Sequence, residues 1–390
     1  MRISVLGGAG LVGQCAVYDL AADRDLESLT VADIDLRRAR RVARKANDIA
    51  GEEKVRAVSI DITQSNAHER IGKTDLIINA VQYYFNEHAM RIALRAGAHY
   101  VDFGGLYWIT KRQLKHSSSF RRRGLLAIPG MGAEPGMSGI FAAEIASGMD
   151  TVETIRIRDA WRDFTKNIPP FFVTWSIETL MDEYTMPAEV YENGRIKQYR
   201  PLSLSENYSF PSPVGDTVVY VTRHSEIATF PASFRDKGIK NVSWMEGGPG
   251  FVEQKVLADA GFAESKQMKI SGCNISPRKF LTALLRQRGL LGYPPDCRPN
   301  SFECLAVDAA GREAGNVRKR WTCVFPSKPE WGVGAAEYSV GIPGATAARF
   351  ILRGETDARG VVPPELALQP ESFIKEVKRK GFKMKKEQLS

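Results

Sequence analysis

The first third of the chain alternates short apolar runs with amphipathic helical patterns. The apolar runs predict strands over residues 2–6, 28–32, 54–59, 75–79, 99–102 and 125–128. The helical patterns between them cover residues 11–22, 36–49, 85–96 and 110–123. Strands that alternate with helices are typical of βαβ units, in which the strands run parallel within one sheet. Residues 1–130 are therefore expected to form an α/β domain with a doubly wound parallel sheet.

After Pro129 the pattern changes. A Gly- and Pro-rich stretch and an apolar helix over residues 137–147 precede segments in which apolar and polar residues alternate: 154–158, 190–191, 195–199, 217–222, 241–245, 301–307 and 318–325. The Asn193-Gly194 pair is a strong hairpin signal. Residues 131–335 are therefore expected to form an α+β domain with a mostly antiparallel sheet and a helix near 277–288. Further helices are predicted at 343–352 and 370–380, within a C-terminal segment of residues 336–390.

A glycine-rich loop lies between the first predicted strand and the first predicted helix. In a G-x-G-x-x-G motif, the glycines allow a tight turn, close approach of a pyrophosphate and close helix–strand packing, while the helix N-terminus favours phosphate. Asp33 ends the second strand twenty residues later, where a carboxylate accepts hydrogen bonds from a ribose hydroxyl. The sequence therefore predicts a Rossmann-type dinucleotide site formed by Gly8, Gly10, Leu11, Val12, Gly13 and Asp33.

The residues after the second strand bear on the choice of cofactor. Asp33 would repel a 2′-phosphate and so favours NAD over NADP. Arg37 and Arg38 follow closely and could bind that phosphate, or they could form an exposed helix face. NAD is therefore expected, and NADP remains possible.

Composition narrows the class of protein. The chain has 54 Lys plus Arg against 45 Asp plus Glu, a net charge of +9, but no alternation of basic and aromatic residues that would indicate a nucleic-acid site. No apolar stretch approaches the roughly 18–20 residues that span a bilayer. The five cysteines include no C-x-x-C pair, and the histidines show no metal-binding spacing. We therefore expect a cytoplasmic protein without a signal peptide, metal, nucleic-acid partner or membrane span.

Several longer motifs resemble one enzyme family. They are V-A-D-I-D at 31–35, F-N-E at 85–87, A-G-A-H-Y-V-D-F-G-G at 96–105, E-P-G-M at 134–137, Y-T-M-P-A at 184–188, S-G-C-N-I-S-P-R at 271–278 and R-G-V-V-P-P-E at 359–365. With these motifs the chain resembles the saccharopine dehydrogenase family over almost its whole length, and most closely the L-lysine 6-dehydrogenase branch.

The resemblance implies a fold and an activity. It implies a Rossmann domain, a larger substrate and dimerisation domain, a C-terminal segment that returns to the first domain, and a homodimer. It also implies hydride transfer between a nicotinamide and a carbon that bears an amine. In the lysine branch, L-lysine would lose hydride from Cε to give an imine, which hydrolyses to allysine and ammonia. The alternatives are a saccharopine reductase-type enzyme that joins allysine to glutamate, and a non-catalytic dinucleotide-binding protein.

Candidate site residues follow the fourth and fifth strands. Asn79 and Ala80 end the fourth strand at the carboxyl edge of the sheet, where such folds bind ligands, and Asn79 resembles the family residue near the nicotinamide ribose. Tyr83 could contact substrate or pack in its loop. Asp102 ends the fifth strand and could hold the substrate ammonium and accept a proton, or it could cap the following loop.

The second domain supplies the remaining candidates. Glu134 lies at the domain junction, where the lysine branch has a small apolar residue, so it could bind a cationic group of the substrate or be a solvated hinge residue. Arg223 and His224 follow a predicted strand. The arginine could bind a carboxylate and the histidine could exchange protons near neutral pH, although either could be structural.

Overall fold

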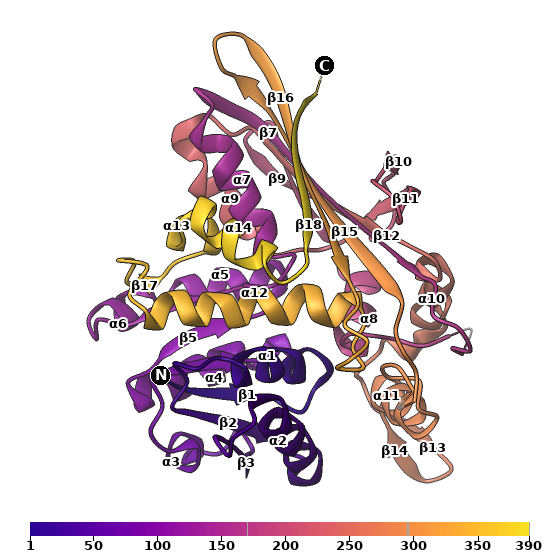
Figure 1. Ribbon diagram of the computed structural model, residues 1–390. Helices are drawn as coiled ribbons and strands as arrows, with labels where there is room; N and C mark the ends of the chain where they lie inside the picture. The colour runs from indigo at the N-terminus through magenta and orange to yellow at the C-terminus, as the bar shows by residue number, and fades with distance from the viewer. Residues whose placement is uncertain (170, 295, 390) are drawn as a thin grey trace.

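Two large sheets and the long helix between them form the framework of the molecule (Figure 1). The computed structural model describes residues 1–169, 171–294 and 296–389. No helix in the described part of the chain combines the length and apolar character needed to cross a bilayer.

The first sheet has seven parallel strands in the order β17-β6-β5-β4-β1-β2-β3. They are β1 (Arg2–Leu6), β2 (Ser28–Asp33), β3 (Val55–Ser59), β4 (Leu76–Asn79), β5 (His99–Asp102), β6 (Leu126–Ile128) and β17 (Gly360–Val361). Apolar strands such as β4 are buried on both faces, as a parallel sheet covered by helices requires. The expected doubly wound sheet is confirmed, with a seventh strand from the C-terminal segment.

The helices of this domain follow the predicted pattern with two differences, of which the first is that a short helix over Ala67–Ile71 was not predicted. They are α1 (Leu11–Ala21), α2 (Leu36–Ala50), α3 (Ala67–Ile71), α4 (Asn86–Ala96), α5 (Leu106–Leu114) and α6 (Ser117–Arg121). The single helix predicted over residues 110–123 is therefore wrong. The first helix begins earlier and ends at Leu114, and a second short helix starts after His116.

The second sheet has nine strands and is mostly antiparallel, as expected. Its main path is β10-β11-β12-β7-β15-β16-β18, and β8 and β9 extend from β12. The strands are β7 (Thr151–Asp163), β8 (Ala188–Glu192), β9 (Arg195–Tyr199), β10 (Ser205–Ser209), β11 (Asp216–Val221), β12 (Asn241–Gly247), β15 (Ser301–Arg312), β16 (Asn316–Pro326) and β18 (Lys383–Leu389). Strands β12 and β7 pair in parallel at the centre of the sheet.

Helices surround this second sheet. Those nearest the domain junction are α7 (Met137–Ser147), α8 (Ile177–Thr185), α9 (Glu226–Ser233) and α14 (Pro370–Lys378). Farther out lie α10 (Phe251–Leu257), α11 (Pro277–Gln287) and a small hairpin of β13 (Met268–Ile270) and β14 (Cys273–Ile275) (Figure 1).

The C-terminal segment connects both sheets. Helix α12 (Ala335–Leu352) contacts α1, β4 and β5 on one side and β15 and β16 on the other. It begins eight residues before the predicted start at 343, because Pro343 lies inside the helix and does not begin it. At Gly341 a Cβ atom would lie 2.8 Å from Cys15 Cβ, so the close approach of α12 to α1 requires glycine there.

The end of the chain does not return to the first domain. After β17 joins the first sheet, the basic residues near the C-terminus form β18, which pairs with β16 at the edge of the second sheet. The segment therefore adds one strand to each sheet, and the expectation that it returns to the Rossmann domain holds for only part of it.

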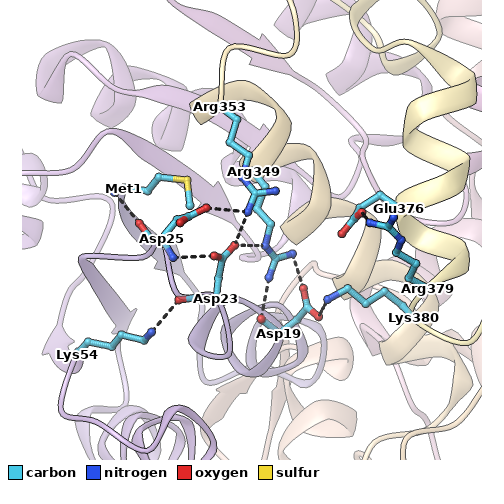
Figure 2. A network of polar contacts seen from close by, with 10 residues as sticks. All are labelled: Met1, Asp19, Asp23, Asp25, Lys54, Arg349, Arg353, Glu376, Arg379 and Lys380. Atoms are coloured by element: carbon cyan, nitrogen blue, oxygen red, sulfur yellow. Dashed lines mark hydrogen bonds and ion pairs between the residues drawn. The ribbon is translucent and has the colours of Figure 1, made fainter.

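A network of ion pairs joins α1 to α12 (Figure 2). The guanidinium of Arg349 binds Asp19 Oδ2 and Asp23 Oδ2, each at 2.6 Å, and donates to the Asp19 carbonyl oxygen at 2.7 Å. Lys380 binds the other oxygen of Asp19 at 2.6 Å. Arg353 reaches Asp23 and Asp25 nearer the surface (Figure 2). Because α1 begins at the glycine loop, this network fixes the helix that carries the loop.

Candidate active site

A cavity of about 940 Å³ lies between the two sheets. Its wall includes the glycine loop and the loops after β4 and β5 of the first domain. From the second domain it includes α8 and the strands β7, β12 and β15. The cavity thus lies at the carboxyl edge of the parallel sheet, where doubly wound folds bind their ligands.

The glycine loop fits the phosphates of a dinucleotide. Gly10, Leu11 and Val12 line the cavity. Gly10 is the N-cap of α1 and no side chain caps the helix, so the first backbone N–H groups are available to an anion. Gly8 and Gly13 serve the packing of the turn, because a Cβ would lie 2.9 Å from the Val5 carbonyl oxygen and 2.4 Å from that of Gly7, respectively.

Asp33 supports the loop from behind. Its carboxylate accepts hydrogen bonds from the backbone N–H of Ala9 at 3.1 Å and of Asp35 at 3.0 Å. The cavity wall beside the loop is formed by residues of the next helix and its cap: Asp35, Arg37, Arg38 and Arg41. Arg38 also donates to the Ala9 carbonyl oxygen at 2.7 Å. The structure thus places guanidinium groups next to the glycine loop.

The ends of β4 and β5 form a buried polar cluster behind the cavity. Ala80 lines the cavity, but Asn79 is 1% exposed and donates to Asn86 Oδ1 at 2.9 Å and to the Tyr100 hydroxyl at 3.1 Å. The side chain of Asn79 therefore orders the sheet edge beneath the site.

Asp102 is fully buried and does not line the cavity. Its two oxygens accept hydrogen bonds from four donors: Tyr100 Oη, the backbone N–H of Gly104 and Gly130, and Gln113 Nε2. Burial raises the pKa of the carboxyl group against the opposing effect of these hydrogen bonds. In this structure Asp102 caps the loops that follow β5 and β6. Its predicted direct contact with the substrate stays a prediction.

Tyr83 lines the cavity and bridges the two domains. Its hydroxyl donates to Asp182 Oδ2 of α8 at 2.6 Å, and Asp182 also binds Arg278. Burial and the Asp182 carboxylate raise the pKa of the phenol. The contact holds the loop after β4 against α8.

Arg223 and His224 point to opposite sides of the backbone, as successive residues of an extended chain do. His224 lines the cavity, stacks on Trp244 with ring centroids 3.8 Å apart, and hydrogen-bonds Glu226 through Nδ1. Arg223 is outside the cavity wall and binds Glu189 through two nitrogens at 2.8 and 2.9 Å. In this structure the Arg223 guanidinium is occupied by Glu189, and its predicted role in substrate binding stays a prediction.

A row of carboxylates lines the wall formed by the second domain. Its members come from the junction loop, β7, α8, β12 and β15: Glu134, Asp159, Glu183, Glu246 and Glu303. Oxygens of Glu134, Asp159 and Glu303 all lie within 4.8 Å of one another. Of these five, only Glu134 was predicted as a site residue from the sequence. For Asp159, Glu246 and Glu303 the available signal was an acidic residue within a strand whose neighbouring residues are mostly buried.

These carboxyl groups are in an unusual electrostatic environment. Burial raises the pKa of all five, and the negative charges of neighbouring carboxylates raise it further. Three oxygens have no hydrogen-bond partner among the described residues: Glu134 Oε2, Asp159 Oδ1 and Glu183 Oε2. A buried carboxylate without a partner carries a large free-energy cost unless it is protonated or bound to a cation. This wall is therefore suited to a cationic ligand.

Comparison with known proteins agrees with these features. The saccharopine dehydrogenase NADP binding domain model matches residues 3–128, and the saccharopine dehydrogenase C-terminal domain model matches residues 132–382. The chain is 24% identical to carboxyaminopropylagmatine dehydrogenase of Synechocystis, covering 96% of this chain and 95% of the relative. It is 25% identical to carboxynorspermidine synthase of Vibrio alginolyticus, covering 94% and 92%.

A solved structure shows the same fold. Apo saccharopine dehydrogenase (L-Glu forming) from Saccharomyces cerevisiae has a TM-score of 0.74 and 19% identity over the whole of both chains. The family resemblance and the expected dinucleotide cofactor are confirmed. The chain belongs to the saccharopine dehydrogenase family of NAD(P)-dependent oxidoreductases.

Proposed function

We propose that the protein is a dehydrogenase that interconverts an imine and a secondary amine in a substrate combining a polyamine chain with an amino-acid carboxylate. The observation that carries this proposal is the carboxylate row, which shares one cavity with the glycine loop. The names of the two curated relatives describe carboxyl-bearing derivatives of agmatine and norspermidine. Such chains are cationic at neutral pH and complement an acidic wall.

The residues of the cavity divide into two groups. Gly10, Leu11 and Val12 would hold the dinucleotide, which supplies the hydride chemistry when bound. The carboxylate row would hold the cationic chain and orient the carbon–nitrogen bond toward the glycine-loop side.

His224 is proposed as the group that exchanges a proton with the substrate nitrogen. Oxidation of an amine to an imine removes a hydride from carbon and a proton from nitrogen. His224 lines the cavity, and Glu226 fixes its Nδ1, so Nε2 is the nitrogen that can face a bound molecule. Glu226 is 1% exposed and accepts a hydrogen bond from Ser138 at 2.7 Å, which holds the pair in place.

L-Lysine is the second candidate substrate. Its ε-ammonium group could bind the same carboxylates, and Arg162 or Arg286 in the cavity wall could bind its α-carboxylate. Saccharopine is disfavoured because its three carboxylates would meet an acidic wall at close range.

A substrate panel tests the proposal. Agmatine, 1,3-diaminopropane and putrescine are each incubated with NADPH or NADH and the aldehyde that corresponds to a carboxyaminopropyl group. L-Lysine and saccharopine are assayed in the oxidative direction. Loss of reduced nicotinamide absorbance with amine plus aldehyde, and not with aldehyde alone, is expected. Turnover of L-lysine with no reaction of any amine–aldehyde pair would favour the second candidate and overturn the first.

A further inference from the structure

The carboxylate row extends across three neighbouring strands. Glu246 of β12 and Asp159 of β7 are register partners in the parallel pair, so their side chains lie on one face one strand apart. Trp161 of β7, two residues after Asp159 and therefore on the same face, pairs with Glu303 of β15. Adjacent strands are about 4.8 Å apart, so the row covers roughly 10 Å.

Two groups of carboxylates occupy the two ends of this row. The oxygens of Glu134, Asp159 and Glu303 gather at the end formed by β7, β15 and the junction loop. Glu183 of α8 and Glu246 of β12 line the same cavity. The Glu246 charge adds to burial in raising the pKa of Glu183. We call the first group the inner cluster and the second, Glu183 with Glu246, the outer pair.

Each end contains buried oxygens without a partner. Asp159 is 5% exposed and Glu183 is 6% exposed, and each has one oxygen without a hydrogen-bond partner in the described structure. Among residues 1–169, 171–294 and 296–389, no Lys or Arg forms an ion pair with any member of either group. One small cation in the inner cluster would leave the unpartnered oxygen of Glu183 without a positive charge nearby. The carboxylate row is therefore suited to a ligand with positive charges at two places.

The aromatic residues beside the row favour an organic cation over a metal ion. Trp161, Trp175 and Trp244 line the same cavity, and Trp161 lies two residues along β7 from Asp159. Indole faces attract ammonium groups and pack against methylene chains. The inner cluster brings together one oxygen from each of three carboxylates, fewer than the six to eight oxygens that Ca²⁺ binds, so a metal ion there would have to complete its shell with second carboxylate oxygens or water.

We infer that this wall is a two-subsite binding track for a linear polyamine, with one ammonium group in the inner cluster and the next at the outer pair. The inference deepens the proposed function and rests on it for the cationic nature of the substrate. A three- or four-carbon spacer between nitrogens suits groups about one strand apart. The track therefore selects diamine and triamine chains over a single alkylammonium group.

Direct binding in the absence of aldehyde tests the track without turnover. Calorimetric titrations of the NADP⁺-saturated protein use 1,3-diaminopropane, putrescine, spermidine, the monoamine butylamine, and CaCl₂ or MgCl₂ as metal probes. Glu183→Gln removes one charge of the outer pair and Asp159→Asn one charge of the inner cluster. Glu253→Gln, on the exposed surface of α10 and outside the cavity wall, is the matched control.

The wild-type protein is expected to bind the diamines and spermidine at least roughly tenfold more tightly than butylamine, because a second charge-assisted contact is gained. Glu183→Gln should weaken diamine binding roughly tenfold and leave butylamine binding nearly unchanged, whereas Asp159→Asn should weaken both. Glu253→Gln should match the wild type.

Three results would overturn the track. The first is equal affinity for butylamine and the diamines, and the second is an equal effect of Glu183→Gln on butylamine binding and on diamine binding. The third is displacement of the amines by Ca²⁺ or Mg²⁺ at a concentration below that at which the amines themselves bind. The proposed function is judged separately. Diamine binding sensitive to Glu183→Gln without turnover of any amine–aldehyde pair would reject the function and retain the track. Turnover of such pairs by a protein whose diamine binding is unaffected by Glu183→Gln would reject the track and retain the proposed function.

Discussion

The ion-pair network between α1 and α12 provides a quantitative test of how the two domains are joined. Replacement of Arg349 by Met keeps most of the aliphatic stem and removes the guanidinium. The side chain of Arg349 is 6% exposed, and it loses contacts to two carboxylates and one carbonyl. Removing one partner of a buried ion pair costs about 3–5 kcal/mol, because the remaining charge is left without compensation.

The cations that remain near Asp19 and Asp23 determine how much of this stability, about 3–5 kcal/mol, is lost in the Arg349→Met variant. Lys380 stays on Asp19 at 2.6 Å, and Arg353 stays near Asp23 at 3.3 Å. The free energy of unfolding is therefore expected to fall by about 3 kcal/mol, the lower end of the range. Arg353→Met is the control, because its side chain is 37% exposed and exposed ion pairs contribute only about 0–1 kcal/mol.

Urea unfolding followed by tryptophan fluorescence and circular dichroism measures both variants. A double-mutant cycle with Asp23→Asn should give a coupling energy of about 0.5–3 kcal/mol for the Arg349–Asp23 pair. NAD(P) binding should be retained below the unfolding transition, because the network contacts the end of α1 opposite the glycine loop. Equal destabilisation by Arg349→Met and Arg353→Met, or a loss below 1 kcal/mol for Arg349→Met, would refute this account of the network.

Other regions of the chain give further predictions. Asp102→Asn places an amide among four donors and should lower stability by about 1–3 kcal/mol. If Asp102 positions the loops of the site, kcat should also fall while KM for the dinucleotide changes little; unchanged kcat would leave it a purely structural residue. Arg37→Ala removes a guanidinium from the cavity wall beside the glycine loop and should weaken NADPH binding roughly tenfold more than NADH binding in fluorescence titrations; equal effects on both would argue against a 2′-phosphate contact. Burial raises the pKa of Glu337 from about 4.5 to about 8, so its contribution to stability is fully present below about pH 4.5 and is lost as the pH rises to about 8, a change of about 5 kcal/mol at most. Glu337→Gln should flatten this dependence in thermal unfolding measured from pH 5 to 8, and an unaltered slope would exclude Glu337 as its source.

Local sequence patterns were sufficient to predict the strands and the glycine loop of the first domain. Most of strands β1 to β6 are short apolar runs that are buried on both faces, and such runs can be recognised without information from distant residues; β3, which contains Arg56, is only partly buried. The glycine loop is recognisable because three glycines must occupy fixed positions in one turn. Family motifs distributed along the chain identified the rest of the architecture. Neither the local patterns nor the family motifs could show that β17 and β18, which belong to the same C-terminal segment, join two different sheets. Strand pairing depends on partners that are far away in the sequence.

The candidate site shows the same division. Asp102 follows its strand as a ligand-binding carboxylate would, yet four donors from separate loops enclose it behind the cavity wall. Asp159, Glu246 and Glu303 belong to strands far apart in the chain, and alternation within a strand shows that side chains share a face without showing what that face meets.

The sequence by itself therefore determined the parallel sheet, the dinucleotide loop and the family. The tertiary structure alone decided which carboxylates face the substrate cavity and which are enclosed, because only the packing of β12, β7 and β15 against the first domain brings their charges to one wall.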